Sequence, residues 1–248
     1  MRVSVKTVGC RLNQAESALI AAQFEAYDCE IVPFKNDCEL CVINTCTVTK
    51  KAELSCIQIC KSLKKRKSST FVILAGCAVN VADKTFAKRS GADLLVNRDE
   101  KFNIPALLSK HFPSMRKIST KTDKPPIPIF SRTRAIVKIQ DGCDFNCAYC
   151  IVPFTRGKPV SRNPKEIIRE INALTSKGFK EVVLTGANIG TYKHESTSLV
   201  NLIQKIEKIK DISRIRLSSI EISTVERNII RLMADSPKLC PSIHLPLQ

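Results

Sequence analysis

Short apolar segments alternate with segments of helical periodicity along the first half of the chain, and this alternation limits the possible folds most strongly. The strand-like segments are residues 3–8, 40–44, 70–75 and 93–96. Apolar residues recur at helical spacing over residues 15–26, 52–63 and 103–108. A parallel sheet covered by helices has this order of elements. We therefore expect an N-terminal α/β domain with an open parallel sheet.

A break in the pattern marks a domain boundary. Residues 121–132 read KTDKPPIPIFSR and contain three prolines but no amphipathic period. Such a segment is typical of an extended linker. We expect an N-terminal domain over residues 1–120, the linker over 121–132 and a second domain over 133–248.

After the linker the alternation resumes with longer units. The predicted strands are 135–140, 181–184, 215–218 and 242–245, and the predicted helices are 164–176, 199–208 and 225–234. Asn163 is the expected cap of the first of these helices, with Pro164 at its first position. About four βα units begin a (βα) barrel but cannot close it, and an open strand edge is a liability for an isolated protein. We expect a partial barrel, with the chain incomplete at its C-terminus or completed by another part.

Composition restricts the compartment and the partners. No apolar run approaches the about 18 residues of a membrane span, and the first ten residues lack the apolar centre of a secretory signal. We expect a cytoplasmic protein without a membrane partner, whose 12 cysteines bind metal or do chemistry rather than form disulfides. The net charge of +17 divides into +9 over residues 1–130 and +8 over the rest. This even excess favours a polyanionic partner that contacts both parts.

Three cysteines follow the first predicted strand of the second domain. Cys143, Cys147 and Cys150 lie in the polar segment DGCDFNCAYC. Three thiolates in one loop can hold three corners of a cubane iron–sulfur cluster and leave the fourth iron open to a small molecule. Structural zinc is the alternative, but it requires four protein ligands, and no fourth Cys or His follows locally.

Three further cysteines end predicted strands of the first domain. Cys10, Cys46 and Cys77 follow consecutive apolar segments. Because the carboxyl ends of parallel strands meet at one crevice, these thiols can converge on a second cluster. The alternative is three unrelated buried cysteines. We interpret the other six cysteines as small packing residues; they are Cys29, Cys38, Cys41, Cys56, Cys60 and Cys240. The spacing of Cys38 and Cys41 is also compatible with zinc or redox chemistry.

The motifs resemble a known family. The spacing of Cys143, Cys147 and Cys150 resembles the radical S-adenosylmethionine signature, and KTVGCRLNQAES, VINTCTVT and AGCAVN resemble the N-terminal domain of tRNA methylthiotransferases. LTGANIGTY, RIRLSSIE and IHLPLQ resemble the bacterial subfamily that acts on threonylcarbamoyladenosine. TRGKPVSR departs slightly from the family pattern, and the family's C-terminal TRAM domain is absent from the sequence. The resemblance implies a radical-SAM fold for the second domain.

The resemblance also implies cofactors and a reaction. Two [4Fe–4S] clusters are implied, one on each set of three cysteines, with S-adenosylmethionine as radical source and methyl donor. The radical would remove hydrogen from carbon 2 of adenine, and the N-terminal cluster would carry or donate sulfur. The implied product is 2-methylthio-threonylcarbamoyladenosine at position 37 of tRNA, in the anticodon loop. An electron donor such as flavodoxin or ferredoxin is implied, and the sulfur source stays open.

Further site residues follow from the same resemblance. Tyr149 and Phe145 would shield the second cluster, and Thr185 and Gly186 would bind the methionine amino group of S-adenosylmethionine. Three basic residues are candidates for phosphate or carboxylate contact, or else solvated loop charges; they are Arg156, Lys158 and Arg162. The alternative functions are an inactive iron–sulfur or tRNA-binding fragment, a zinc-binding RNA protein, and a methylthiotransferase that acts on isopentenyladenosine or on a ribosomal protein.

Overall fold

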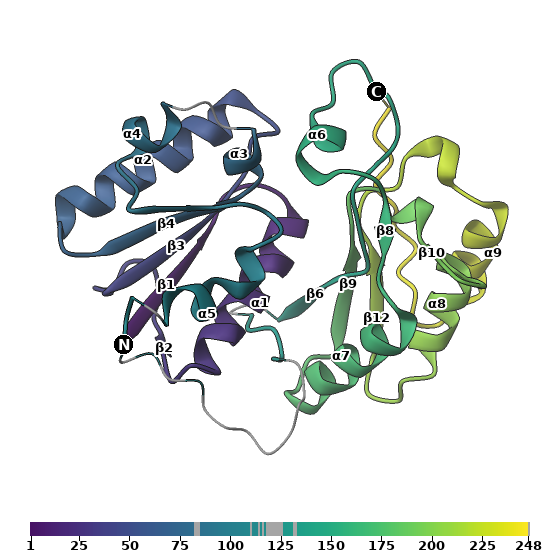
Figure 1. The fold of residues 1–248 in the computed structure, drawn as a ribbon. Coiled ribbons are helices and arrows are strands. Elements are labelled where there is room, and N and C mark those ends of the chain that lie inside the picture. The colour runs from purple at the N-terminus through teal and green to yellow at the C-terminus, as the bar shows by residue number, and fades with distance from the viewer. Residues whose placement is uncertain are drawn as a thin grey trace. The chain divides into compact units, whose positions relative to one another are not determined.

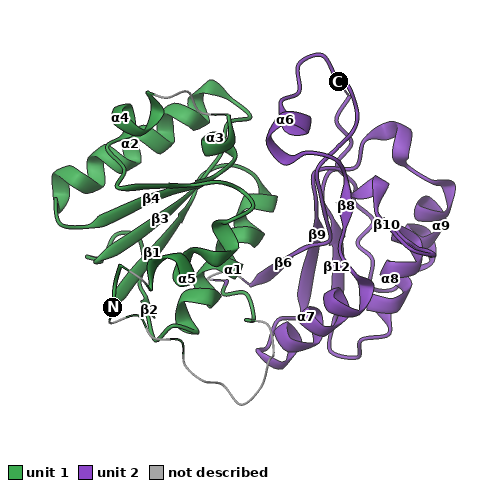
Figure 2. Cartoon of the chain, in the orientation of Figure 1, with its two compact units in different colours: residues 1–129 green, residues 130–248 purple. Residues whose placement is uncertain are grey.

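The structure, a computed structural model, divides the chain into two compact units of residues 1–129 and 130–248 (Figure 2). It describes residues 1–81, 85–109, 111–113, 115, 117, 126–130 and 133–247. Most of the predicted linker lies outside the described residues. Its residue Ile129 donates a backbone hydrogen bond of 3.1 Å to the Ala18 carbonyl and so belongs to the first unit.

The first unit contains a five-stranded parallel sheet in the order β2-β1-β3-β4-β5. The strands are β1 (Arg2–Thr7), β2 (Glu30–Ile31), β3 (Leu40–Thr45), β4 (Phe71–Gly76) and β5 (Leu94–Val96). The four predicted strands are confirmed. The sequence pattern missed β2, because two residues are too few to show an alternation.

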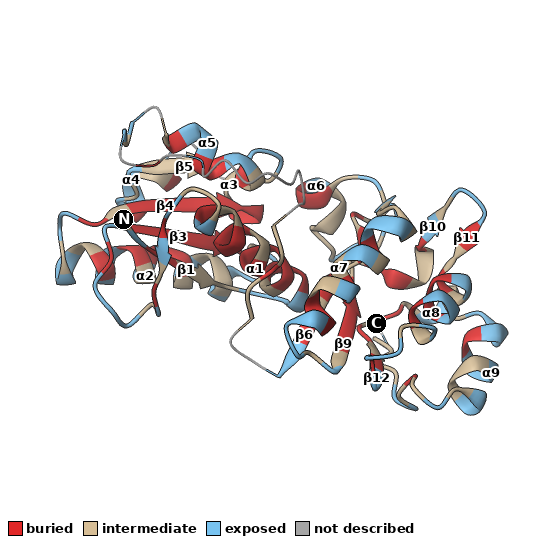
Figure 3. Ribbon diagram, turned by 90° about the horizontal axis from the view of Figure 1, so that it is seen from below, coloured by how far each residue is buried: buried red, intermediate tan, exposed pale blue. Residues whose placement is uncertain are grey.

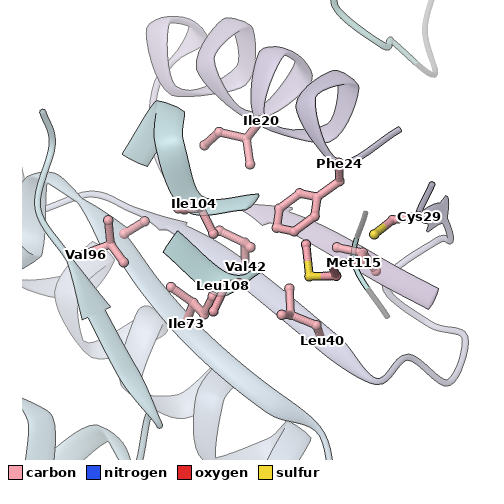
Figure 4. Packing of buried hydrophobic residues seen from close by; sticks show 12 residues of the cluster. Ile20, Phe24, Cys29, Leu40, Val42, Ile73, Val96, Ile104, Leu108 and Met115 are labelled. Carbon is pink, nitrogen blue, oxygen red and sulfur yellow. The ribbon is translucent and has the colours of Figure 1, made fainter. Parts of the chain in front are cut away.

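Helices cover both faces of this sheet (Figure 1). Helices α1 (Arg11–Glu25) and α5 (Ile104–Leu108), the latter after a 3-10 turn η1 (Lys101–Asn103), cover one face, and α2 (Lys50–Arg66), α3 (Cys77–Asn80) and α4 (Phe86–Ser90) cover the other. In the first core, Ile20 and Phe24 of α1 and Ile104 of α5 pack on the sheet (Figure 4).

The central strands supply both cores, because their successive side chains point to opposite faces. In β3, Leu40 and Val42 enter the core beneath α1, whereas Cys41 and Ile43 enter the core beneath α2. All six residues of this strand are buried (Figure 3). Cys41 therefore packs as a small apolar residue, as do three other cysteines of the two cores, Cys29, Cys38 and Cys60.

The second unit is built on a three-stranded parallel sheet in the order β12-β9-β6. Its strands are β6 (Arg134–Lys138), β9 (Glu181–Thr185) and β12 (Arg214–Leu217), and the helices between and after them are α7 (Pro164–Ser176), α8 (Leu199–Glu207) and α9 (Arg227–Asp235). The Asn163 side chain accepts a hydrogen bond from the Lys165 backbone N–H, which confirms the predicted cap.

The prediction of a fourth strand over residues 242–245 is wrong for the described residues. Only isolated bridges occur there, between Ser219 and His244 and between Ile215 and Leu239. Pro241 and Pro246 flank the segment. Proline has no N–H to donate to a strand ladder, so pairing does not extend past single residues.

Short elements complete the second unit. They are β7 (Gln140–Asp141), α6 (Val152–Arg156), β8 (Val160–Ser161), η2 (Ile189–Thr191), β10 (Lys193–His194), β11 (Thr197–Ser198) and η3 (Ile222–Thr224). The antiparallel pair of β7 and β8 closes the base of the loop that carries three cysteines. Within the described parts of the chain, every helix is too short or too polar to cross a membrane.

Candidate functional site

The cysteine loop of the second unit runs between β7 and β8. The Cys143 backbone N–H donates to the Gly157 carbonyl at 2.9 Å, and the Cys150 N–H donates to the Cys147 carbonyl at 3.0 Å. All three thiols are partly accessible. Burial raises the pKa of the Cys143 thiol, and the neighbouring Cys150 and Cys147 charges raise it further. The three predicted cysteines thus lie in a single loop whose base is closed by β7 and β8.

Gly142 fixes the turn into this loop. Its φ is +73°, and a Cβ at this position would lie 2.0 Å from the Lys158 carbonyl oxygen and 2.6 Å from the Gly157 carbonyl oxygen. A backbone oxygen cannot move aside as a flexible side chain can. Only glycine permits this close approach of the two ends of the loop.

An acidic residue, Asp141, anchors the same loop. Its carboxylate accepts hydrogen bonds from the Gly142 backbone N–H at 2.9 Å, from Lys138 at 2.6 Å and from Arg156 at 2.8 Å. The Arg156 residue is only 6% exposed. The guanidinium of Arg156, one of the three predicted basic contacts, is therefore held against Asp141 inside the unit.

Gln140, which was not predicted from the sequence, joins the cysteine loop to the segment that follows strand β9. Its amide Nε2 donates to the Gly142 carbonyl at 2.6 Å, and its Oε1 accepts from the Asn188 backbone N–H at 3.1 Å. A Cβ on Gly186 would lie 2.6 Å from that Oε1. A polar residue directly after an apolar strand was the available signal for Gln140.

Two buried polar atoms near the carboxyl ends of β9 and β12 lack a hydrogen-bond partner among the described residues. They are Asn188 Nδ2 and Ser218 Oγ, and both residues are 4% exposed. Thr185, which ends β9, is 1% exposed. Unsatisfied buried polar atoms are rare, and ligands bind at this edge of a parallel sheet. The two atoms are therefore candidates for hydrogen bonds to a polar ligand.

The remaining predicted residues of this unit differ in position. Tyr149 is 71% exposed and Phe145 is half-buried. Arg162 donates to the Lys138 carbonyl at 2.7 Å and pairs with Glu170 at 2.8 Å. Among the three predicted basic residues, Lys158 is exposed, Arg162 is half-buried and Arg156 is buried.

The second set of cysteines lies at the carboxyl ends of three neighbouring strands. Cys10 precedes α1, Cys46 follows β3 and Cys77 begins α3 directly after β4. Gly9 has a φ of +106°, and a Cβ there would lie 2.5 Å from Cys46 Cβ and 2.8 Å from Cys46 Sγ. The turn before Cys10 is therefore in direct contact with Cys46.

Side-chain hydrogen bonds connect these three turns. Asn13 Nδ2 donates to the carbonyls of Val8 and Thr45, both at 2.8 Å. Thr45 Oγ1 donates to the Ala75 carbonyl at 2.8 Å and accepts from the Ala78 backbone N–H at 3.1 Å. Asn13 thus joins the first turn to the second, and Thr45 joins the second to the third.

Cys56 of α2 lies beside Cys46. Burial raises the pKa of Cys56 to about 11, and the backbone N–H of Cys46 opposes this shift. Cys56 is 0% exposed. It is therefore a protonated packing residue at neutral pH, in agreement with its predicted role.

Both cysteine sets have donors that suit iron–sulfur clusters. No three His, Cys, Asp or Glu side chains converge on one ion in the part of the chain that the structure describes. Cysteine thiolates are the usual protein ligands of iron–sulfur clusters. In the first unit, the close contact of Gly9 with Cys46 keeps two cysteine-bearing turns together. In the second, one loop supplies all three thiols.

A substitution tests whether Thr45 positions the N-terminal cysteines. Thr45→Val keeps the side-chain shape but leaves the Ala75 carbonyl and the Ala78 N–H without this partner. We expect a loss of about 2 kcal/mol in unfolding free energy, from two lost hydrogen bonds in a buried place. We also expect less iron at the N-terminal site after anaerobic reconstitution. The measurement is iron analysis of a chain in which Cys143, Cys147 and Cys150 are replaced by alanine.

Thr70→Val is the matched control. Thr70 is 2% exposed and donates to the Cys38 carbonyl at 3.0 Å, just before β4 begins. It lies at the amino end of the sheet, away from the cysteine turns. This variant should lose stability but keep its iron. An equal loss of iron in both variants would refute the positioning role of Thr45.

Comparison with known proteins agrees with this arrangement. Residues 2–97 match "Uncharacterized protein family UPF0004", and residues 137–248 match "Radical SAM superfamily". The solved structure of TsrM, a radical S-adenosylmethionine methyltransferase from Kitasatospora setae with cobalamin and a [4Fe–4S] cluster bound, aligns with a TM-score of 0.66 at 11% identity. It covers 100% of this chain and 61% of that chain. The UPF0004 match thus lies within the first unit of the structure and the Radical SAM match within the second.

Curated relatives are similar over nearly the whole chain. The chain is 34% identical to the threonylcarbamoyladenosine tRNA methylthiotransferase MtaB of Thermotoga maritima, over 99% of this chain and 58% of the relative. It is 31% identical to MtaB of Aquifex aeolicus, over 100% of this chain and 63% of the relative. It is 29% identical to the tRNA-2-methylthio-N(6)-dimethylallyladenosine synthase of Endomicrobium trichonymphae, over 100% of this chain and 59% of the relative. Over nearly its whole length the chain is thus similar to tRNA methylthiotransferases, and it spans about three fifths of the length of these relatives.

Proposed function

We propose that this chain carries the catalytic centre of a tRNA methylthiotransferase that converts threonylcarbamoyladenosine at position 37 to its 2-methylthio derivative. The observation that carries the proposal is the presence of two three-cysteine sites, each at the carboxyl edge of its own parallel sheet. One site serves radical generation and the other serves sulfur. The activity is proposed for the whole protein, since the chain spans about three fifths of its relatives.

In the second unit, Cys143, Cys147 and Cys150 would hold a [4Fe–4S] cluster. When bound, this cluster and S-adenosylmethionine supply the 5′-deoxyadenosyl radical. The chain's own contribution is to fix the loop, since Asp141 and Gln140 bind its first turn from two sides. Preorganised groups of this kind fix geometry while the cofactor supplies the chemistry.

The polar edge of the same sheet would bind S-adenosylmethionine. Thr185 ends strand β9 and Gly186 follows it. Two residues with an unsatisfied buried polar atom also follow strands, Asn188 after β9 and Ser218 directly after β12. A donor and a hydroxyl can bind the carboxylate, ribose or amino groups of this molecule. Binding there would remove the cost of leaving these atoms unpaired.

In the first unit, Cys10, Cys46 and Cys77 would hold the second [4Fe–4S] cluster. Its proposed role is to carry or donate the sulfur atom that enters carbon 2 of the adenine. Asn13 and Thr45 keep the three turns in register. A second S-adenosylmethionine would supply the methyl group.

Charge supports a tRNA substrate. Both parts of the chain carry an excess of positive charge, +9 and +8. A polyanion that contacts both parts would be attracted electrostatically by each. The anticodon loop is the proposed contact, with the exposed Lys158 as one candidate. A flavodoxin- or ferredoxin-like electron donor and a cytoplasmic location complete the proposal.

Analysis of tRNA nucleosides tests the substrate. We expect cells that lack the full-length gene to lose 2-methylthio-threonylcarbamoyladenosine and to accumulate the unmethylthiolated nucleoside, as measured by mass spectrometry. Loss of the 2-methylthio mark from isopentenyladenosine instead would assign the other tRNA substrate. An unchanged set of tRNA nucleosides would contradict the proposal and would direct attention to a ribosomal protein.

A further inference from the structure

A fully buried ion pair lies beneath the N-terminal cysteine turns. Lys101 Nζ is 2.6 Å from Glu16 Oε2, and both side chains are 0% exposed. Glu16 lies on α1, which begins directly after Cys10, and Lys101 begins η1. Removing two charges from water is costly, and apolar residues of similar size often stabilise a core equally well. A pair in this place therefore calls for an explanation other than stability.

The ammonium end of the pair lies beside Gly76, the residue before Cys77. A Cβ on Gly76, the residue before Cys77, would lie 3.5 Å from Lys101 Nζ. Its other two nearest atoms would be Asn44 Oδ1 at 3.0 Å and the Thr45 carbonyl oxygen at 3.7 Å, so the Glu16 carboxylate lies farther away than the ammonium group. The positive end of the ion pair faces the turn that carries the cysteine.

Asn44 adds a second feature to the same place. It is 0% exposed, and its Oδ1 has no hydrogen-bond partner among the described residues. Its Nδ2 is held by the Asn13 carbonyl at 2.9 Å and by Ser17 Oγ at 3.0 Å, which fixes the direction of the amide. The surroundings of Gly76 are therefore polar, buried and rigidly held, and charge–charge interactions are strong in such a place.

We propose that the Glu16–Lys101 ion pair raises the reduction potential of the cluster on Cys10, Cys46 and Cys77. This inference rests on the proposed function, which places a cluster there. Reduction adds one electron from an external donor and no proton, so the net charge of the cluster becomes more negative by one unit. The nearer Lys101 ammonium favours the reduced state more than the farther Glu16 carboxylate disfavours it. Glu16 and Lys101 are thus positioning residues that act through the electric field.

A redox titration tests this proposal. The parent is the full chain with Cys143→Ala, Cys147→Ala and Cys150→Ala, so that only the N-terminal cluster is present. After anaerobic reconstitution with iron and sulfide, the parent and its Glu16→Leu/Lys101→Met derivative are titrated with dithionite and followed by electron paramagnetic resonance. We expect a more negative midpoint potential in the derivative, with the same iron content.

The matched control removes the same two charges from the other end of the sheet. Arg2 and Glu30 pair at 3.8 Å near the amino ends of β1 and β2, with side chains 44% and 69% exposed. Arg2→Met/Glu30→Leu should leave the midpoint unchanged. An equal shift in both derivatives would show that the effect does not depend on the place of the Glu16–Lys101 pair beside Gly76 and would overturn the proposal.

A charge-reversed derivative covers the case in which the apolar one does not fold. Glu16→Lys/Lys101→Glu keeps a buried ion pair but places the carboxylate toward Cys77, so its midpoint should be more negative than that of the parent. An unchanged midpoint in a folded derivative that holds its cluster would overturn the inference alone. Failure of both derivatives to fold would assign the pair a purely structural role and would also overturn it. A parent that binds no cluster would refute the N-terminal cluster of the proposed function, and the inference with it.

Discussion

Cys147→Ala is expected to abolish cleavage of S-adenosylmethionine, whereas Cys46→Ala is expected to keep cleavage and abolish methylthio transfer to tRNA. The physical reason is that Cys147 belongs to the single loop between β7 and β8, while Cys46 lies in the other unit, at the end of β3. Loss of one of three thiolates leaves a cluster iron without its protein ligand. The measurement is 5′-deoxyadenosine formed by the reconstituted protein, together with 2-methylthio nucleoside in added tRNA.

Cys60→Ala is the control for removal of a thiol. Cys60 is 0% exposed in the core beneath α2, and burial raises its pKa to about 11. The variant should lose about 1 kcal/mol of stability and keep iron, cleavage and transfer. Equal loss of cleavage in the Cys147 and Cys46 variants would contradict the separate roles of the two sites. Loss of iron from the Cys60 variant would show that this thiol is a ligand.

Gly142→Ala is expected to lower cleavage about a hundredfold, since a displacement of about 1 Å at a catalytic group can have that effect. The added Cβ would meet the Lys158 carbonyl oxygen at 2.0 Å, so one end of the cysteine loop must move. The positive φ of +73° adds a strain of about 1–2 kcal/mol for a residue with a Cβ. Iron at the N-terminal site should be unaffected. The measurements are 5′-deoxyadenosine formation and iron content.

Gly178→Ala separates strain from contact. Gly178 lies in the same unit with a φ of +92°, and a Cβ there would have nothing within 4 Å. This variant should lose stability by a similar amount through backbone strain, but should keep its iron and its rate of cleavage. If Gly178→Ala reduced cleavage as much as Gly142→Ala, the close approach at the cysteine loop would not be the cause.

Local pattern was sufficient for the main elements. Each strand of the first sheet except β2 was predicted to within a residue or two, because buried parallel strands are continuous apolar runs. The loop with Cys143, Cys147 and Cys150 was equally evident, because its ligands are close in sequence. The predicted fourth strand of the second unit failed, because the pairing of a short segment between two prolines depends on its neighbours in space.

The sequence by itself determined the α/β class, the order of the long elements and the six cysteines at the carboxyl ends of strands. Tertiary structure alone decided how distant side chains pair. It turned Arg156 toward Asp141, placed Gln140 between the cysteine loop and β9, and buried Lys101 against Glu16, 85 residues away. A charged residue reads as exposed in a sequence, because burial of a charge is favourable only beside a partner, and that partner is chosen by the fold.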